Sequence, residues 1–74
     1  MKTKFKKIRK SKGFSARRLA ELSGVSIQTI QFYDQNILNI NNAKINTLAK
    51  LVHVLECDIT DVLEDENLIK MLKK

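Results

Sequence analysis

Hydrophobic residues recur at helical spacing along nearly the whole chain, and β-branched residues never alternate cleanly with polar ones. Helices place apolar residues three and four positions apart, whereas half-buried strands alternate them strictly. The pattern therefore predicts an all-α protein. The expected helices span residues 4–12, 16–23, 27–34 and 43–55. A fifth should begin after Asp58, where Asp61 completes a pattern resembling a capping box. Residues 67–74 continue at helical spacing and predict a C-terminal helical extension.

Glycine and serine mark the boundaries of the second and third expected helices. Gly13 and Gly24 each follow a helical segment, as C-terminal stop signals do. Ser15 and Ser26 precede the next segments and are good N-caps. Only Val25 separates Gly24 from the Ser26 cap. Two helices joined by so few residues cannot run antiparallel, so we expect them to cross steeply.

An asparagine-rich loop is expected between the third and fourth helices, at residues 35–42. Four asparagines in eight residues favour turns, because this side chain bonds its own backbone. Ile40 is too apolar for a free loop and should fold back onto the core. Asn41 or Asn42 should cap the fourth helix. The inner face of that helix is predicted to consist of Ile45, Leu48, Leu51, Val52 and Leu55.

Length and composition indicate one small globular domain. The chain has 74 residues, of which 43% are hydrophobic and 30% charged. No apolar run approaches the roughly 18 residues of a membrane span, and the N-terminus has no apolar segment typical of a secretion signal. A single cysteine, Cys57, makes no internal disulfide and no multi-cysteine zinc site. We therefore expect a cytoplasmic protein.

Charge is strongly segregated along the chain, which carries a formal net charge of +6. Nine of the 14 basic residues lie in residues 1–18, and six of the eight acidic ones lie in residues 56–66. A basic end favours a polyanion such as nucleic acid, although the same charges also suit a solvated surface. A membrane-surface helix is disfavoured, because Phe5 and Ile8 form too thin an apolar stripe.

Catalytic and metal-binding side chains are sparse. His53 is the only histidine, and Cys57 follows it by four residues. The two side chains could touch on a helix, but two ligands rarely hold a metal. No nucleophile, base and orienting side chain form a recognisable catalytic set, because the only histidine lies on the fourth expected helix. The sequence predicts no enzyme, no metal, no cofactor and no small-molecule ligand.

The segment from residue 13 to residue 30 has the helix, short turn and helix layout of DNA-binding proteins. Such a layout places its second helix in a major groove. Ala20 is small where the two helices approach, and Gly24 permits the positive φ needed to leave the first of them. Val25 and Ile30 can pack the turn against Leu19. This combination, beside a basic N-terminal segment, indicates DNA binding.

These residues resemble the lambda-repressor-like (Xre) helix-turn-helix family over about residues 5–64. The matching stretches are Ile8-Arg9-Lys10, Leu19-Ala20-Glu21, Gly24-Val25-Ser26, Thr29-Ile30, Ile40-Asn41-Asn42-Ala43, Leu48 through Leu55, and Asp61-Val62-Leu63. The resemblance implies a compact bundle of five helices, a homodimer and a short operator. It also implies a structural ion pair between Arg9 and Asp34. On this basis residues 1–66 form the DNA-binding domain, and residues 67–74 form a tail.

The third helix, residues 27–34, is the expected recognition helix. Ile30 and Tyr33 should face the core. The opposite face carries Ile27, Gln28, Gln31 and Phe32, with Thr29 at its edge. A glutamine can bond adenine N6 and N7 together, and apolar side chains can lie against thymine methyl groups. The resemblance assigns base reading to Ile27, Gln28, Thr29 and Phe32.

Phosphate contacts are expected from residues next to the recognition helix. The resemblance assigns them to Ser26 and to the start of the second helix. Arg17 and Arg18 supply positive charge there, and we expect Lys10 or Lys12 to add to it. Phosphate contacts of this kind position a protein on the duplex without reading its sequence.

The predicted function is that of a sequence-specific transcriptional regulator that binds double-stranded DNA as a homodimer on a palindromic operator. One short helix reads few base pairs, and two-fold pairing doubles the site. The expected dimer interface consists of Ile59, Val62, Leu68, Ile69 and Leu72. The alternative is a protein-interaction module or antitoxin-like partner, since Ile27 and Phe32 are apolar side chains on an exposed face.

Overall fold

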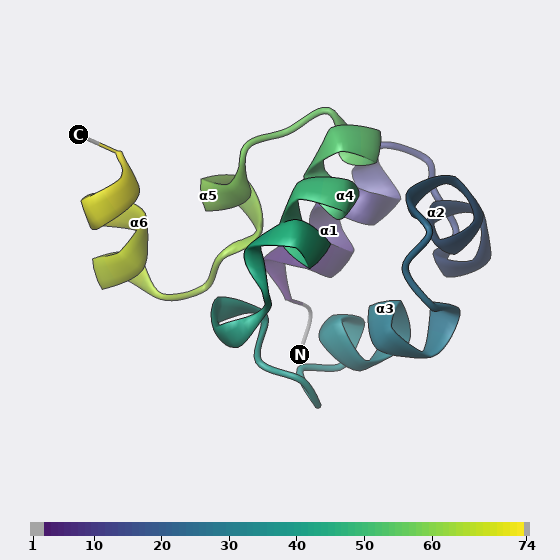
Figure 1. Cartoon of the computed structure of the whole chain (residues 1–74), viewed down its shortest axis with the longest axis horizontal. Coiled ribbons are helices and arrows are strands. Elements are labelled where there is room, and N and C mark those ends of the chain that lie inside the picture. Colours follow the sequence, from purple (N-terminus) through teal and green to yellow (C-terminus); the bar gives the residue numbers. More distant parts are fainter. Residues whose placement is uncertain (1–2, 74) are drawn as a thin grey trace.

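The computed structural model describes residues 3–73 and shows an all-helical chain (Figure 1). The helices are α1 (Lys4–Ser11), α2 (Ala16–Ser23), α3 (Ile27–Asp34), the 3-10 helix η1 (Ile40–Asn42), α4 (Ile45–Leu55), α5 (Ile59–Val62) and α6 (Glu66–Leu72). No strand occurs among the described residues. The predicted all-α class is confirmed, with five helices in the bundle and a sixth as the C-terminal extension. The longest described helix has 11 residues, and none is long and apolar enough to cross a membrane.

The core forms where α2 packs against α3 and α4, while α1 packs against α3 and α5, and α5 also packs against α4. The buried residues that share this core are Phe5, Leu19, Ile30, Tyr33, Ile40, Leu48, Leu51, Leu55 and Val62. Phe5 meets Tyr33 edge to face, with ring centroids 6.2 Å apart, a favoured geometry for aromatic pairs. Ile40 is only 3% exposed, so it folds back onto the core as predicted.

The caps and turns of the helix-turn-helix segment follow the sequence closely. The backbone N–H of Arg18 donates to Ser15 Oγ at 3.0 Å, so Ser15 caps α2. Ser26 caps α3 in the same way, accepting from the Thr29 N–H at 3.1 Å. Gly24 leaves α2 with φ +78°, in the left-handed region that favours glycine. The bounds of α2 and α3 are those predicted.

The start of α4 differs from the prediction. The helix begins at Ile45, and Lys44 stands at its N-cap without a side-chain bond. The two asparagines expected to cap it lie in η1 instead. Because the helix starts later, Ile45 lies on its first turn with 67% of its surface exposed. The prediction that Ile45 belongs to the inner face is therefore wrong, whereas Leu48, Leu51 and Leu55 are buried there.

The C-terminal helix α6 is tied to the bundle mainly through the segment that leads into it. Asn41 Oδ1 accepts from the backbone N–H of Glu64 at 2.9 Å and of Asp65 at 3.0 Å. The backbone N–H of Lys4 donates to Glu64 Oε1 at 2.6 Å, and the Lys4 ammonium lies 3.7 Å from the Glu66 carboxylate. In Figure 1, α6 lies at the opposite end of the molecule from α2 and α3.

Val62 must be removed from the predicted dimer interface. Its side chain is fully buried in the core of its own chain and has no surface to offer a partner. Ile69 is 8% exposed and is nearly as enclosed. The remaining members, Ile59, Leu68 and Leu72, retain exposed surface. Of the predicted tail, residue 74 lies outside the described residues.

Candidate nucleic-acid interface

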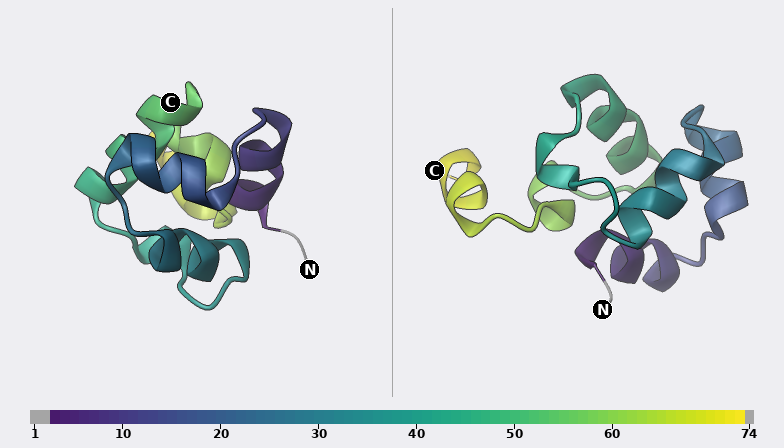
Figure 2. Two further views of the ribbon diagram at one scale, coloured as in Figure 1. Left: turned by 90° about the vertical axis from the view of Figure 1, so that its right-hand side faces the viewer. Right: turned by 90° about the horizontal axis from the view of Figure 1, so that it is seen from below.

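Helix α3 lies at the edge of the molecule with one side fixed in the core (Figures 1 and 2). Its buried residues are Ile30, Tyr33 and Asp34. The left view of Figure 2 faces α2 and α3, which lie next to each other at this end of the molecule. A helix anchored along one side presents the rest of its surface to a partner.

The predicted base-reading residues differ in how far they face outward. Successive side chains turn by about 100° in a helix, so positions 28, 32 and 35 lie within about 35° of the direction opposite the buried side. Gln28 is exposed, and Phe32 is half-buried. Ile27 is nearer the edge of the outward face and is 38% exposed. Gln35 was not predicted as part of this surface, although its spacing of seven residues from Gln28 was a usable signal.

Thr29 is half-buried and is bonded to the cap of its own helix. The Ser26 hydroxyl donates to Thr29 Oγ1 at 2.8 Å while Ser26 Oγ accepts from the Thr29 N–H. Thr29 acts as an acceptor in this pair, so its own hydroxyl proton remains available to an acceptor such as a phosphate oxygen. The two residues therefore form one hydroxyl cluster at the N-terminal end of α3.

Positive charge lies beside this end of α3. Arg17 is exposed and lines a shallow depression together with Ala20, Glu21, Gly24, Val25, Ser26 and Ile27. Arg18 is also exposed and lies 3.5 Å from Glu21 in the next turn of α2. The structure therefore brings Arg17 together with Ser26, two residues for which phosphate contacts were predicted. Exposed ion pairs are weak, so Arg18 can exchange Glu21 for a phosphate.

The two lysines at the end of α1 lie in different surroundings. Lys10 is exposed on the last turn of α1, and Lys12 is its C-cap. Burial and the charge of Asp61 raise the pKa of the Cys57 thiol, and the charge of Lys12 partly offsets this rise. Lys12 therefore lies near the α4–α5 turn, which contains Cys57. That turn is on the far side of the molecule from α3 in Figure 1. The structure therefore does not bring Lys12 to the start of α3.

The ion pair implied between Arg9 and Asp34 is present and buried. Arg9 Nη2 lies 2.6 Å from Asp34 Oδ2, and Arg9 Nε donates to Asp34 Oδ1 at 3.4 Å. Arg9 Nη1 also donates to the carbonyl oxygen of Phe14 at 2.7 Å. One guanidinium thus links α1, the α1–α2 turn and the end of α3, which fixes the orientation of α3 on the bundle.

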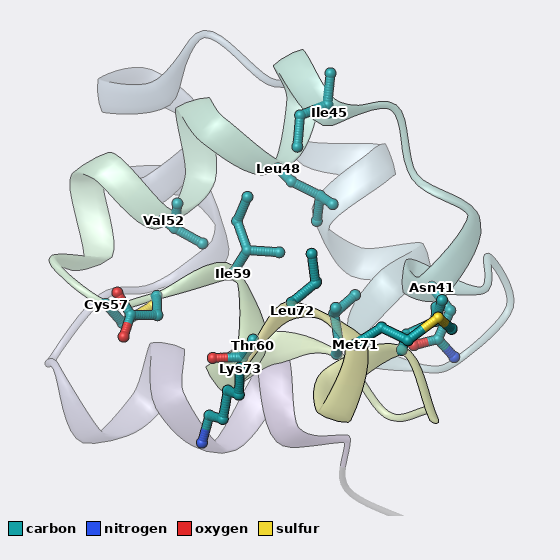
Figure 3. A pocket seen from close by; sticks show the side chains of 13 residues that line it. Asn41, Ile45, Leu48, Val52, Cys57, Ile59, Thr60, Met71, Leu72 and Lys73 are labelled. Atoms are coloured by element: carbon teal, nitrogen blue, oxygen red, sulfur yellow. The ribbon is translucent and has the colours of Figure 1, made fainter. Parts of the chain in front are cut away.

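A second surface feature is an apolar groove of about 830 Å³ between α4, α5 and α6 (Figure 3). Figure 3 shows Ile45, Leu48 and Val52 of α4 facing Leu72 of α6, with Ile59 between them. Ile45, Met71 and Leu72 each keep more than 60% of their surface exposed and all line this groove. The sequence pattern did not reveal it, because Ile45 was expected in the core.

The described residues hold no metal-binding cluster. Among residues 3–73, no three His, Cys, Asp or Glu side chains converge on a common point. His53 is exposed on α4, and Cys57 is half-buried after it. These two residues therefore gain no third ligand from elsewhere in the described part of the chain.

Comparison with known proteins identifies the family. A helix-turn-helix family, HTH_3, matches residues 5–62, which cover helices α1 to α5 except for Lys4, the first residue of α1. Neither a curated protein nor a solved structure matches the chain. The family match covers the cap, the turn and the exposed helix described above. The chain therefore belongs to the lambda-repressor-like (Xre) helix-turn-helix family of DNA-binding transcription regulators.

Proposed function

We propose that the protein reads a specific sequence of double-stranded DNA by inserting the N-terminal half of α3 into the major groove. The observation that carries this proposal is the construction of α3. Its inner side is fixed by Ile30, Tyr33 and the buried Asp34, while Gln28 and Ile27 remain accessible at its start. Base readout needs such a helix, rigid on one side and free on the other.

Arg17, Arg18 and Ser26 are the proposed phosphate contacts, with Lys10 as an additional cation. Arg17 and Ser26 line one depression beside the start of α3, and Arg18 follows Arg17 on the first turn of α2. Contacts with phosphate hold a protein in register on the duplex and make its affinity depend on salt. Lys12 is left out of this proposed set, because its charge lies near the α4–α5 turn.

We further propose that two copies bind a palindromic operator and pair through the groove between α4, α5 and α6. Ile45, Met71 and Leu72 form an apolar patch that a single chain leaves open. The groove lies at the α6 end of a molecule that is 33 Å long, and α3 lies toward the other end (Figure 1). A two-fold axis at the groove leaves both copies of α3 exposed. Half-sites one helical turn apart require the two recognition helices to be about 34 Å apart.

Charge supports a second copy as the occupant of the groove. Asp58 borders the groove on the α5 side, and Lys73 borders it at the end of α6. In a two-fold arrangement the same surface meets itself, so each lysine can approach an aspartate of the partner. Complementary charges around an apolar centre fix the register of such an interface.

Selection of bound duplexes from a random DNA pool at two salt concentrations tests the DNA proposal. We expect one enriched motif made of two inverted half-sites, with weaker binding at the higher salt concentration. Gln28→Ala should relax the preference at one position per half-site. Arg17→Ala should weaken binding to all sequences alike. Absence of any enriched motif would overturn sequence-specific reading and favour a protein partner on the Ile27 and Phe32 face.

Sedimentation of the whole chain tests the dimer. We expect the parent protein to sediment as a dimer at micromolar concentration and Leu72→Asp to sediment as a monomer. Ile37→Asp is the matched control, since Ile37 is 60% exposed and Leu72 is 61% exposed, but Ile37 does not line the groove. A monomeric parent protein, or a control that dissociates equally, would refute this interface.

A further inference from the structure

The recognition helix and both segments that flank it contain no lysine or arginine. This cation-free stretch extends from Leu19 to Ala43. Arginine and lysine are the commonest readers of guanine, because they donate to O6 and N7 together. Helix α3 itself has no arginine or lysine to make that contact. A guanine contact would have to come from another segment, such as Arg17 on α2.

Acidic side chains are equally scarce on this surface. Cytosine can be read by a carboxylate that accepts from its N4 amino group. The one acid of α3 is Asp34, which is 6% exposed and bonded to Arg9. Glu21 of α2 lines the same depression as Ile27 and pairs with Arg18. The outward surface of α3 therefore lacks the side chains that most directly recognise either base of a G·C pair.

The first two turns of α3 carry a different set of groups. Gln28 and Gln31 are exposed carboxamides three residues apart, so both lie on neighbouring positions of the same side. A carboxamide matches adenine, which offers the N7 acceptor and the N6 donor. Ile27 and Phe32 supply apolar surface on either side of them, and thymine is the base that presents a methyl group in the major groove.

We infer that the operator half-site of this protein is rich in A·T pairs where α3 contacts it. Gln28 and Gln31 bond adenine there, and Ile27 and Phe32 cover thymine methyl groups. This inference rests on the proposed function, because it requires α3 to lie in the major groove. It adds the chemical class of the base pairs that are read, which follows from the absence of charge on the outward surface of α3.

Base analogues in the selected duplex test the inference directly. Replacing thymine by uracil removes only the methyl group, and replacing adenine by 7-deazaadenine removes only the N7 acceptor. We expect each uracil beneath Ile27 or Phe32 to weaken binding about three- to fivefold, the value of one buried methyl group. We expect 7-deazaadenine at the position of Gln28 to weaken binding about tenfold, because one bond of a bidentate pair is lost.

Protein variants then assign each effect to a residue. The Gln28→Ala protein should no longer distinguish adenine from 7-deazaadenine at one position, and Gln31→Ala should lose this distinction at another. Asn46→Ala is the matched control, since it removes an exposed carboxamide from α4. Phe32 is half-buried, so its replacement can also weaken the fold. Phe32→Leu keeps apolar bulk and Phe32→Ala removes it, and comparing the two separates a lost contact with the thymine methyl group from a loss of folding.

The possible outcomes separate this inference from the proposed function. A selected half-site dominated by G·C pairs would overturn the inference while leaving sequence-specific binding intact. An A·T-rich half-site that tolerates both analogues at every position would also overturn it, because recognition would then depend on DNA shape. Failure to bind any duplex would overturn the proposed function itself. Sensitivity to the analogues that disappears in Gln28→Ala would support the inference.

Discussion

Arg9 Nη2 and Asp34 Oδ2 lie 2.6 Å apart, and their side chains are only 9% and 7% exposed. The pair joins α1 to the end of the recognition helix across 25 positions of sequence. Taking two charges out of water is costly, and the cost is offset only when the remaining donors also find partners. Arg9 meets this condition through its bond to the carbonyl oxygen of Phe14 at 2.7 Å. The pair therefore sets the orientation of α3.

Removing one member of this pair should strongly destabilise the fold. We expect Asp34→Asn or Arg9→Met to lower the free energy of unfolding by about 3–5 kcal/mol, because a buried charge loses its partner. Such a loss approaches the entire stability of a small domain, which is about 5 kcal/mol at the low end. Urea denaturation followed by circular dichroism measures the change.

The double variant Arg9→Met with Asp34→Leu provides the control. Replacing both charges with apolar side chains leaves no unpaired charge, and similar replacements are often nearly neutral. We expect the double variant to be more stable than either single variant. If the two single losses simply add in the double variant, the two side chains do not stabilise each other.

The turn between α2 and α3 should depend on the backbone of Gly24. A Cβ built at this position meets no other atom within 4 Å, so the penalty comes from φ +78° and not from crowding. We expect Gly24→Ala to cost about 1–2 kcal/mol of stability. Gly24→Asn should cost less, because asparagine tolerates the left-handed region. Equal urea midpoints for the two variants would show that conformation at this position is not limiting.

The helix-turn-helix segment could be predicted from sequence because its signals are local. Ser15, Ser26 and Gly24 each act within three residues of their own positions, through caps and a left-handed turn. The alternation between buried Ile30 and Tyr33 and exposed Gln28 likewise follows from helical periodicity. Local rules of this kind do not depend on how distant segments pack.

The features that the sequence could not supply depend on distant contacts. Asn41 resembles a helix cap in sequence, but its side chain binds the backbone of Glu64 and Asp65, more than 20 residues away. Helix α4 starts at Ile45 instead, and the Ile45 side chain lines the groove. Val62 was predicted in the dimer interface, yet it lies in the core, where α5 packs against α1.

The same two bonds of Asn41 predict how α6 is held. Asn41→Ala removes the acceptor for both backbone N–H groups, and each net bond contributes about 1 kcal/mol. We expect the α6 amides to exchange with solvent at least fivefold faster, while amides in α2 and α4 keep their rates. Asn42→Ala is the control, since Asn42 is the exposed neighbour in η1. Hydrogen exchange measured by NMR would contradict this view if α6 were equally protected in both variants.

The thiol of Cys57 should react slowly in the folded protein. Burial raises the pKa of this thiol above its ordinary value, the charge of Asp61 raises it further, and Lys12 partly opposes both. The reactive species is the thiolate, so the folded chain contains less of it at pH 8 than the unfolded chain does. We expect iodoacetamide to alkylate Cys57 more slowly in buffer than in urea, with the pH midpoint of the rate shifted upward.

The free energy of unfolding should change as the Cys57 thiol titrates, and replacing Lys12 tests what sets the pKa of this thiol. Because the folded pKa exceeds the unfolded one, the protonated thiol contributes stability that is complete below the unfolded pKa and is lost as pH rises through the folded pKa. Lys12→Gln removes the opposing charge, so it should raise the pKa further and slow alkylation again. Lys10→Gln is the control, since Lys10 is not among the charges that act on Cys57. An alkylation rate that rises in Lys12→Gln, or falls equally in both variants, would show that Lys12 does not face this thiol.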